Sequence, residues 1–132
     1  MIKELHVARV EGLPADQPIV MLNLMKFRSE SLDGDGTGWD GYLRYSRMAN
    51  KLIKERSGRI IWAGEVNGAA LGPEVHGQWD YMALVTYPSP AAFLDMMHSD
   101  DYVLANVHRD NGCESHLIMA VNETFNALAG PK

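Results

Sequence analysis

The segment PIVMLNLMKFR, from Pro18 to Arg28, decides the fold, because it is apolar enough for a buried strand yet carries a carboxamide at its centre. Strand alternation places Met21, Asn23 and Met25 on one face, and the intervening residues on the other face are apolar as well. An unpaired buried carboxamide costs about 1–3 kcal/mol. Asn23 therefore requires either a neighbouring hydrogen-bond partner or a ligand in a pocket.

Composition and charge limit the classes of protein that this chain can represent. Its 132 residues, 46% hydrophobic and 22% charged, are typical of one folded domain. The net charge of −5 disfavours nucleic acid as a partner, and no apolar run approaches the roughly 18 residues that cross a bilayer. The single Cys113 excludes an intrachain disulfide framework. We expect a cytoplasmic protein that binds neither nucleic acid nor membrane.

Periodicity and capping signals predict the other elements. Thr37 and Asp40 form a variant of the capping box, and from Trp39 apolar residues recur every three or four positions, which is typical of one buried helical stripe. Ser89-Pro90 and Ser99 begin two further helical segments. Cys113 is expected in a loop after Asn111-Gly112. The predicted strands are residues 18–28, 59–66, 79–87 and 116–121, and the predicted helices are residues 39–57, 90–97 and 100–109.

The order of these elements predicts the fold class. Strand, helix, strand, strand, helix, strand is the βαββαβ pattern of ferredoxin-like α+β domains, with a four-stranded antiparallel sheet and both helical regions on one face. The strands are apolar at both parities, so something must cover the second face. A second copy of the chain is the simplest cover, and we expect a homodimer that forms a dimeric α+β barrel. Residues 1–17 form an N-terminal arm or short helix, 18–122 the domain, and 123–132 a tail.

Several blocks in order resemble a known family: PIVMLNLMKFR, WDGYLRYSRMAN, GRIIWAGEV, LGPE, WDYMALVTYPSPAAFLDMM and DDYVLANVHRDNGCESHLIMA. From Pro18 to Val121 the chain resembles the domain of unknown function 1330 family, small proteins of the dimeric α+β barrel superfamily. The resemblance implies the fold and the homodimer. Related branches include cofactor-independent monooxygenases, muconolactone isomerases, haem-binding dismutases and stress-response dimers, and no motif of theirs matches here.

Side chains with an apolar body and a polar tip are the candidates for a ligand site. Gathered beside Asn23, they would form an apolar pocket with a few hydrogen-bonding groups, the usual form of a small-molecule site. Packing in the core or at the dimer interface is the alternative reading of the aromatic residues. The candidate ligand-binding residues are Asn23, Tyr42, Tyr45, Trp62, Tyr102, His108 and Arg109.

The pair His108-Arg109 has two interpretations. Cations near a helix C-terminus complement its dipole. Alternatively, Arg109 anchors a carboxylate or enolate, with His108 as a general base. Neighbours on a helix point about 100° apart, so only one is expected to face a ligand, and Arg109 is preferred. The histidines lie in different elements without metal-ligand spacing, and we expect neither a metal nor a cofactor.

Three classes of function stay open on the sequence. The first is a cofactor-independent enzyme, either an isomerase or a monooxygenase, acting on an aromatic or carboxylate-bearing molecule. The second is a non-catalytic dimer that binds a metabolite or responds to stress. The third is a structural dimer without a ligand. We expect small-molecule binding in a pocket between the sheet and the helices, with catalysis left open.

Overall fold

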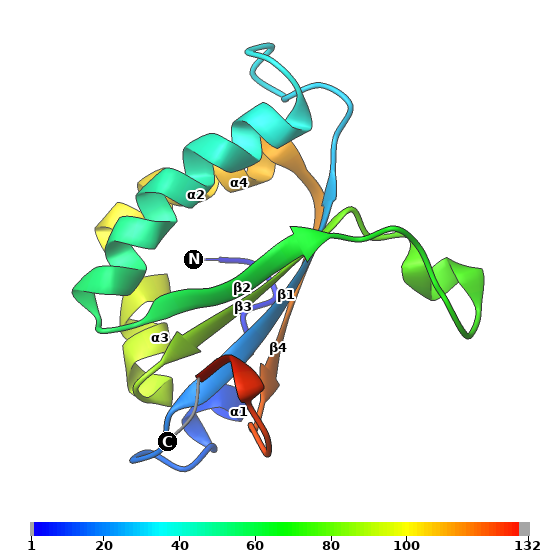
Figure 1. Cartoon of the computed structure of the whole chain (residues 1–132). Helices are drawn as coiled ribbons and strands as arrows, with labels where there is room; N and C mark the ends of the chain where they lie inside the picture. Colours follow the sequence, from blue (N-terminus) through cyan, green and yellow to red (C-terminus); the bar gives the residue numbers. More distant parts are fainter. Residues whose placement is uncertain (1, 130–132) are drawn as a thin grey trace.

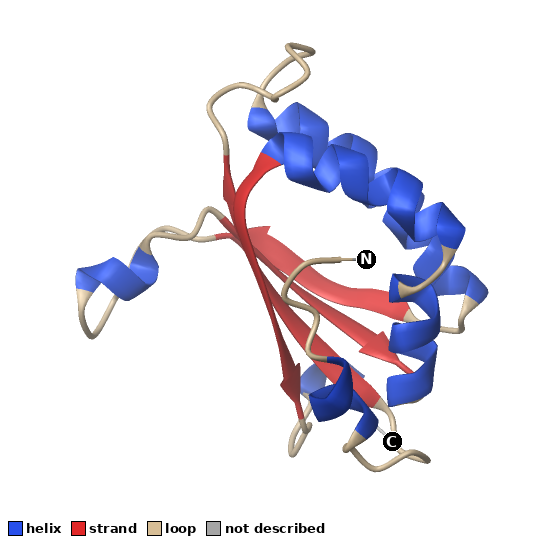
Figure 2. Ribbon diagram, turned by 180° about the vertical axis from the view of Figure 1, so that it is seen from behind, coloured by secondary structure: helices blue, strands red, loops and turns tan. Residues whose placement is uncertain are grey.

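The computed structural model describes residues 2–129 and shows one four-stranded antiparallel sheet with its long helices packed against one face (Figures 1 and 2). The strand order is β2-β3-β1-β4, which confirms the predicted ferredoxin-like topology. The strands are β1 (Ile19–Phe27), β2 (Arg59–Glu65), β3 (Tyr81–Tyr87) and β4 (Cys113–Val121). The helices are α1 (Val7–Glu11), α2 (Gly38–Glu55), α3 (Pro90–Met97) and α4 (Asp100–Gly112), with short 3₁₀ turns η1 (Glu74–Gly77) and η2 (Ala127–Ala129).

Local capping fixes where the three long helices begin. At the start of α2, the Thr37 hydroxyl accepts from the Asp40 backbone N–H at 3.1 Å and the Asp40 carboxylate accepts from the Thr37 N–H at 2.8 Å, which confirms the capping box. Ser89 Oγ caps α3, and Ser99 Oγ caps α4 by accepting from the Tyr102 N–H at 3.1 Å. The second cap explains why the second helical region is broken into α3 and α4.

The junction between α4 and β4 corrects the sequence prediction. We expected Cys113 in a loop and the last strand to begin at His116. Instead α4 continues to Gly112 and β4 begins at once with the buried Cys113. The Gly112 carbonyl accepts a 2.9 Å hydrogen bond from the backbone N–H of Arg28, which follows β1, so the helix end is tied directly to the sheet.

The two faces of the sheet have different environments. The inner face contributes Met21, Met25, Ala83, Val85 and Tyr87 to a core completed by α2, α3 and α4. The outer face is also apolar, yet α2, α3 and α4 all lie on the other side of the sheet (Figure 1). Outer-face residues from all four strands are half-buried or exposed: Val20, Leu22, Leu24, Trp62, Met82, Leu84, Leu117, Met119 and Val121.

In the described residues 2–129, no helix combines the length and the apolar character needed to cross a membrane.

Helices α2 and α4 touch backbone to backbone through glycines. A Cβ atom at Gly112 would lie 2.5 Å from the Gly38 carbonyl oxygen and 2.6 Å from the Tyr42 backbone nitrogen. A Cβ at Gly41 would lie 3.0 Å from Cα of Gly112. Only glycine permits this separation, and it sets how closely the tyrosines of α2 approach those of α4.

We predict that Gly112→Ala lowers the free energy of unfolding by about 1–3 kcal/mol, because the added methyl group meets backbone atoms that cannot rotate away. Urea denaturation measures the change. The matched control is Gly12→Ala, at an ordinary φ of −77° and with its nearest contact 3.4 Å from the new Cβ, which is expected to stay within about 0.5 kcal/mol of wild type. Equal stability of Gly112→Ala and wild type would contradict the close packing of α2 on α4.

Candidate functional site

A cavity of about 40 Å³ lies between the inner face of the sheet and the helices α2, α3 and α4. This volume has room for roughly two or three water molecules. Its walls are mostly apolar, and among the described residues no Asp, Glu, Lys or Arg lines it. The polar side chains in its lining are Asn23, Tyr42, Tyr45, Ser46, Asn50, Tyr87, Tyr102 and His116.

Asn23 is held by His116, which in turn is held by Arg109. The Asn23 Oδ1 and His116 Nε2 atoms are 2.8 Å apart, and a guanidinium nitrogen of Arg109 lies 3.1 Å from His116 Nδ1. A guanidinium can only donate, so Nδ1 accepts and the ring proton sits on Nε2, which donates to Asn23. The Asn23 amide group then donates to the Met21 carbonyl at 3.2 Å. The central carboxamide therefore has protein partners and also lines the cavity.

His116 is neutral in this arrangement. Burial, assisted by the neighbouring positive charge of Arg109, lowers the pKa of His116 to about 3. Both ring nitrogens are engaged, so the ring cannot accept a substrate proton without breaking its bond to Arg109. His116 acts as a rigid neutral connector between β1 and α4.

Arg109 and His108 diverge on α4. Arg109 Nε donates to Asn106 Oδ1 at 2.7 Å, and its Nη2 lies 3.9 Å from the Asp110 carboxylate. The guanidinium stands behind His116 and does not itself line the cavity. His108 does not line the cavity either, and its buried Nδ1 has no hydrogen-bond partner in the part of the chain that the structure describes. Arg109, the residue preferred as a direct ligand contact, and its neighbour His108 therefore both lie outside the cavity wall.

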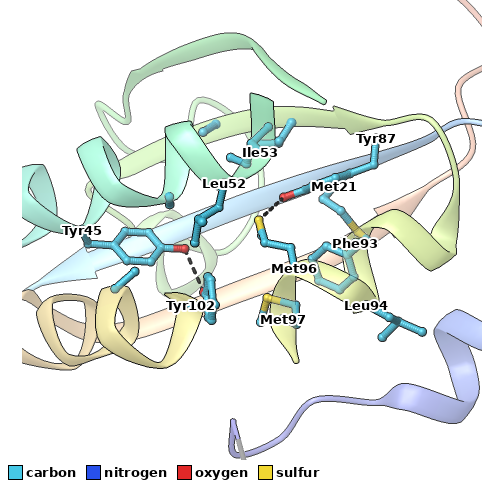
Figure 3. Close-up of a cluster of buried hydrophobic side chains, with 14 of the residues drawn as sticks. Met21, Tyr45, Leu52, Ile53, Tyr87, Phe93, Leu94, Met96, Met97 and Tyr102 are labelled. Atoms are coloured by element: carbon cyan, nitrogen blue, oxygen red, sulfur yellow. Dashed lines mark hydrogen bonds between the residues drawn. The ribbon is translucent and has the colours of Figure 1, made fainter. Parts of the chain in front are cut away.

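Three of the predicted tyrosines converge on the cavity. The Tyr45 and Tyr102 hydroxyl oxygens are 2.9 Å apart (Figure 3), and the Tyr42 ring packs 5.9 Å from that of Tyr45, centroid to centroid. Burial raises the pKa of all three phenols, so each keeps its proton near neutral pH and can donate a hydrogen bond. A fourth, Tyr87, hydrogen-bonds to the Met96 sulfur at 3.9 Å.

Trp62 does not join them, which corrects the expectation that it lies beside Asn23. The register of β2 against β3 shifts between Ile60 and Trp62, with Ile60 opposite Val85 and Trp62 opposite Leu84. This shift is a β-bulge of one extra residue. It turns Trp62 to the outer face, where the side chain is 42% exposed, while Ile60 lines the cavity.

His116 is the site residue that sequence reasoning missed. On the sequence, His116 was considered only as a metal ligand. A metal site was not expected, because no histidine pair shows ligand spacing. In the sheet, Met25 lies opposite His116 and Asn23 opposite Ile118, so His116 and Asn23 are diagonal neighbours on one face. Strand alternation places His116 and Ile118 on one face of the last strand, and only the register against β1 shows that Asn23 shares this face.

The structure also bears on two other kinds of chemistry, nucleophilic attack by Cys113 and metal binding. Burial raises the pKa of the Cys113 thiol to about 11, which leaves it protonated and a poor nucleophile at neutral pH. In residues 2–129, no three His, Cys, Asp or Glu side chains gather as a metal ion would require.

Fold and site together define a ferredoxin-like α+β protein with a small, uncharged, partly polar cavity under its helices. RPA0582 from Rhodopseudomonas palustris, a protein of unknown function, is similar to this chain, with 26% identity over 96% of this chain and 97% of that one and a TM-score of 0.82. A hydroxynitrile lyase from Passiflora edulis is 16% identical over 84% of this chain and 99% of its own, with a TM-score of 0.59. At3g17210 from Arabidopsis thaliana is 11% identical over 82% and 97%, with a TM-score of 0.55.

The last two likenesses concern the fold alone. No protein-family model matches the chain, and no curated protein matches it. The resemblance to the domain of unknown function 1330 family therefore stays a prediction.

We predict that His116 makes stability depend on pH. The folded pKa lies near 3, below the ordinary value of 6.5, so below about pH 6.5 the unfolded chain binds a proton that the folded chain refuses. Wild type should lose up to about 1.4 kcal/mol per pH unit from this group as the pH falls from 6.5 towards 3.

His116→Gln, which offers an acceptor to Arg109 and a donor to Asn23, should lack this contribution in urea denaturation from pH 7 to pH 4. The exposed His76 provides the control, and His76→Gln is expected to follow the wild-type slope. Identical slopes for wild type and His116→Gln would contradict a buried neutral histidine.

Proposed function

We propose that this chain is a small-molecule-binding protein that works as a homodimeric α+β barrel and holds an aromatic or carboxylate-bearing organic molecule. The observation that carries the proposal is the set of polar groups, including the Tyr45–Tyr102 hydroxyl pair and the Asn23–His116 pair, on the wall of an otherwise apolar cavity. Apolar walls with a few fixed polar groups are the usual form of a small-ligand site.

The cavity accepts the head of such a molecule and leaves the rest outside. A volume of about 40 Å³ holds only a few heavy atoms. Among the lining residues that are not fully buried, Ser46 and Asn50 lie on α2, and Ile60, the most exposed of them, lies on the edge strand β2. They mark the mouth, and a larger ligand would extend outward between α2 and β2.

Charge favours a neutral or anionic ligand over a cation. The lining residues in the described chain include no carboxylate that could pair with a cation. The positive charge of Arg109 stands directly behind His116 and acts on both Tyr45 and Tyr102. An oxygen-bearing head group is the chemistry that this environment accommodates.

Cofactor-independent isomerase or monooxygenase activity is the catalytic form of the proposal. The site supplies protonated tyrosine hydroxyls that can polarise a carbonyl or stabilise an enolate. Its histidine is engaged at both nitrogens, so a reacting substrate would have to supply its own labile proton or be activated by these donors alone. Turnover assays on ligands found by binding would separate an enzyme from a binder.

The second candidate is a non-catalytic stress-response or structural dimer without a ligand. The observation that favours it is the pairing of Asn23, which finds both a side-chain and a backbone partner within the protein. On this reading the polar chain fixes the sheet register and the cavity holds only water.

The homodimer is supported by the outer face of the sheet. Side chains of all four strands make this face apolar, and Trp62, Leu117 and Met119 are each at least 41% exposed. Contiguous apolar surface of this kind on a soluble protein marks an interaction site. Two copies placed face to face would bury it in an α+β barrel.

We predict that a cavity-filling variant abolishes ligand binding. Ala83 lines the cavity from β3, and Ala83→Val adds two methyl groups to a space of about 40 Å³. In a thermal-shift screen of aromatic and carboxylate metabolites, a specific ligand raises the Tm of wild type by linkage, and this shift should be lost in the variant.

The control for that screen is Ala63→Val, because Ala63 pairs with Ala83 on the neighbouring strand but is exposed and does not line the cavity. It should keep the ligand-induced shift. A wild-type chain that responds to no member of the panel would favour the ligand-free dimer instead.

We predict that Met119→Lys converts the dimer to a folded monomer, because it places a charge on the apolar outer face of strand β4. Light scattering at micromolar concentration gives the mass, and circular dichroism confirms folding. Val103→Lys is the control, since Val103 is similarly exposed, at 52% against 42% for Met119, but lies on α4. A monomeric wild type would refute the face-to-face dimer.

A further inference from the structure

We infer that the Tyr45–Tyr102 pair presents one unused hydroxyl proton to the cavity, and that the head group it receives is an anionic oxygen, as in a carboxylate or an enolate. The inference rests on the proposed small-molecule function and narrows it to one chemical class. The two tyrosines come from α2 and α4 and meet at the cavity wall (Figure 3).

The two tyrosine hydroxyls carry one more proton than the hydrogen bond between them uses. Two phenol groups bring two hydroxyl protons, and the single 2.9 Å hydrogen bond between their oxygens uses one of them. Whichever tyrosine donates, the other keeps a hydroxyl proton with no acceptor among the described residues. Tyr102 is 0% exposed and Tyr45 is 8% exposed, so bulk water does not reach the pair. A buried hydroxyl donor without an acceptor is destabilising, so this proton requires an acceptor inside the cavity.

Three of the neighbouring polar side chains, those of His116, Asn23 and Tyr87, already have partners within the protein. His116 Nδ1 accepts from Arg109, and Asn23 Oδ1 accepts from His116. The Tyr87 hydroxyl is directed to the Met96 sulfur (Figure 3). Among the described residues, the only hydrogen bond of the two hydroxyls is the one between them, and we assign the acceptor of the second proton to a molecule that enters the cavity.

Electrostatics selects an anionic acceptor over a neutral one. The positive charge of Arg109 acts on both tyrosines, and its nearest carboxylate, Asp110, lies 3.9 Å away with a side chain that is 65% exposed. Solvent screens that carboxylate more than it screens the buried side of the guanidinium. With no acidic side chain in the described lining, a negative oxygen gains both a hydrogen bond and a favourable field.

The test uses formate and formamide, two probes of three heavy atoms that differ in charge. Each is titrated into the full-length protein while NMR follows the ring signals of Tyr45, Tyr102 and His116. The variants are Tyr45→Phe, Tyr102→Phe and the double variant. Each single variant keeps one hydroxyl proton for the ligand, so formate should bind within about threefold of wild type. The double variant removes the donor and should bind formate at least tenfold more weakly, as expected for a hydrogen bond to a charged group.

The preference of the wild-type protein for formate over formamide tests the inference without any variant. Formate should perturb the NMR signals of the three rings at concentrations where formamide does not. Equal binding of formate to the double variant would overturn the donor role and leave the proposed function standing. Equal binding of both probes to wild type would overturn the anionic class, because a neutral acceptor would then suffice. Binding of neither probe would overturn the inference and indicate that water is the acceptor. The metabolite screen with Ala83→Val judges the proposed function separately, because it depends on the cavity and not on these hydroxyls.

Discussion

The hydrogen bond between Asn23 Oδ1 and His116 Nε2 is the interaction on which the site depends. It joins adjacent strands β1 and β4 across the inner face, and through Arg109 it connects the sheet to α4. The donor-only chemistry of arginine fixes the histidine tautomer, and the tautomer fixes which end of the carboxamide faces β4. A buried polar group that looked out of place in an apolar strand is thus the first member of a three-residue chain that holds a sheet and a helix in register.

Most of the fold could be predicted because its signals are local. The beginnings of α2, α3 and α4 follow from capping side chains one turn away, and the strands follow from their apolar composition. The start of β4 could not be predicted in the same way. Gly112 packs against the backbone of α2 and bonds to Arg28, contacts that are distant in sequence, and an Asn-Gly pair that is typical of a turn instead ends a helix directly at a strand.

The candidate site also combines residues that local sequence patterns predict with contacts that they do not predict. Strand parity and helical periodicity are enough to bring Asn23, Tyr42, Tyr45 and Tyr102 to one cavity. The contact between Asn23 and His116 depends on the register of two strands that are far apart in the chain, which no local pattern encodes. The placement of Arg109 behind His116, and not in the cavity, depends on α4 running directly into β4 without the predicted loop.

The bulge in β2 decides which large side chain of the edge strand faces the cavity. One extra residue, Ile61, separates Ile60 on the cavity face from Trp62 on the outer face. In a regular strand, residues two positions apart share a face, so without the bulge Ile60 and Trp62 would both lie on the inner face. The bulge therefore keeps a large aromatic side chain away from the cavity and leaves the smaller Ile60 to line it.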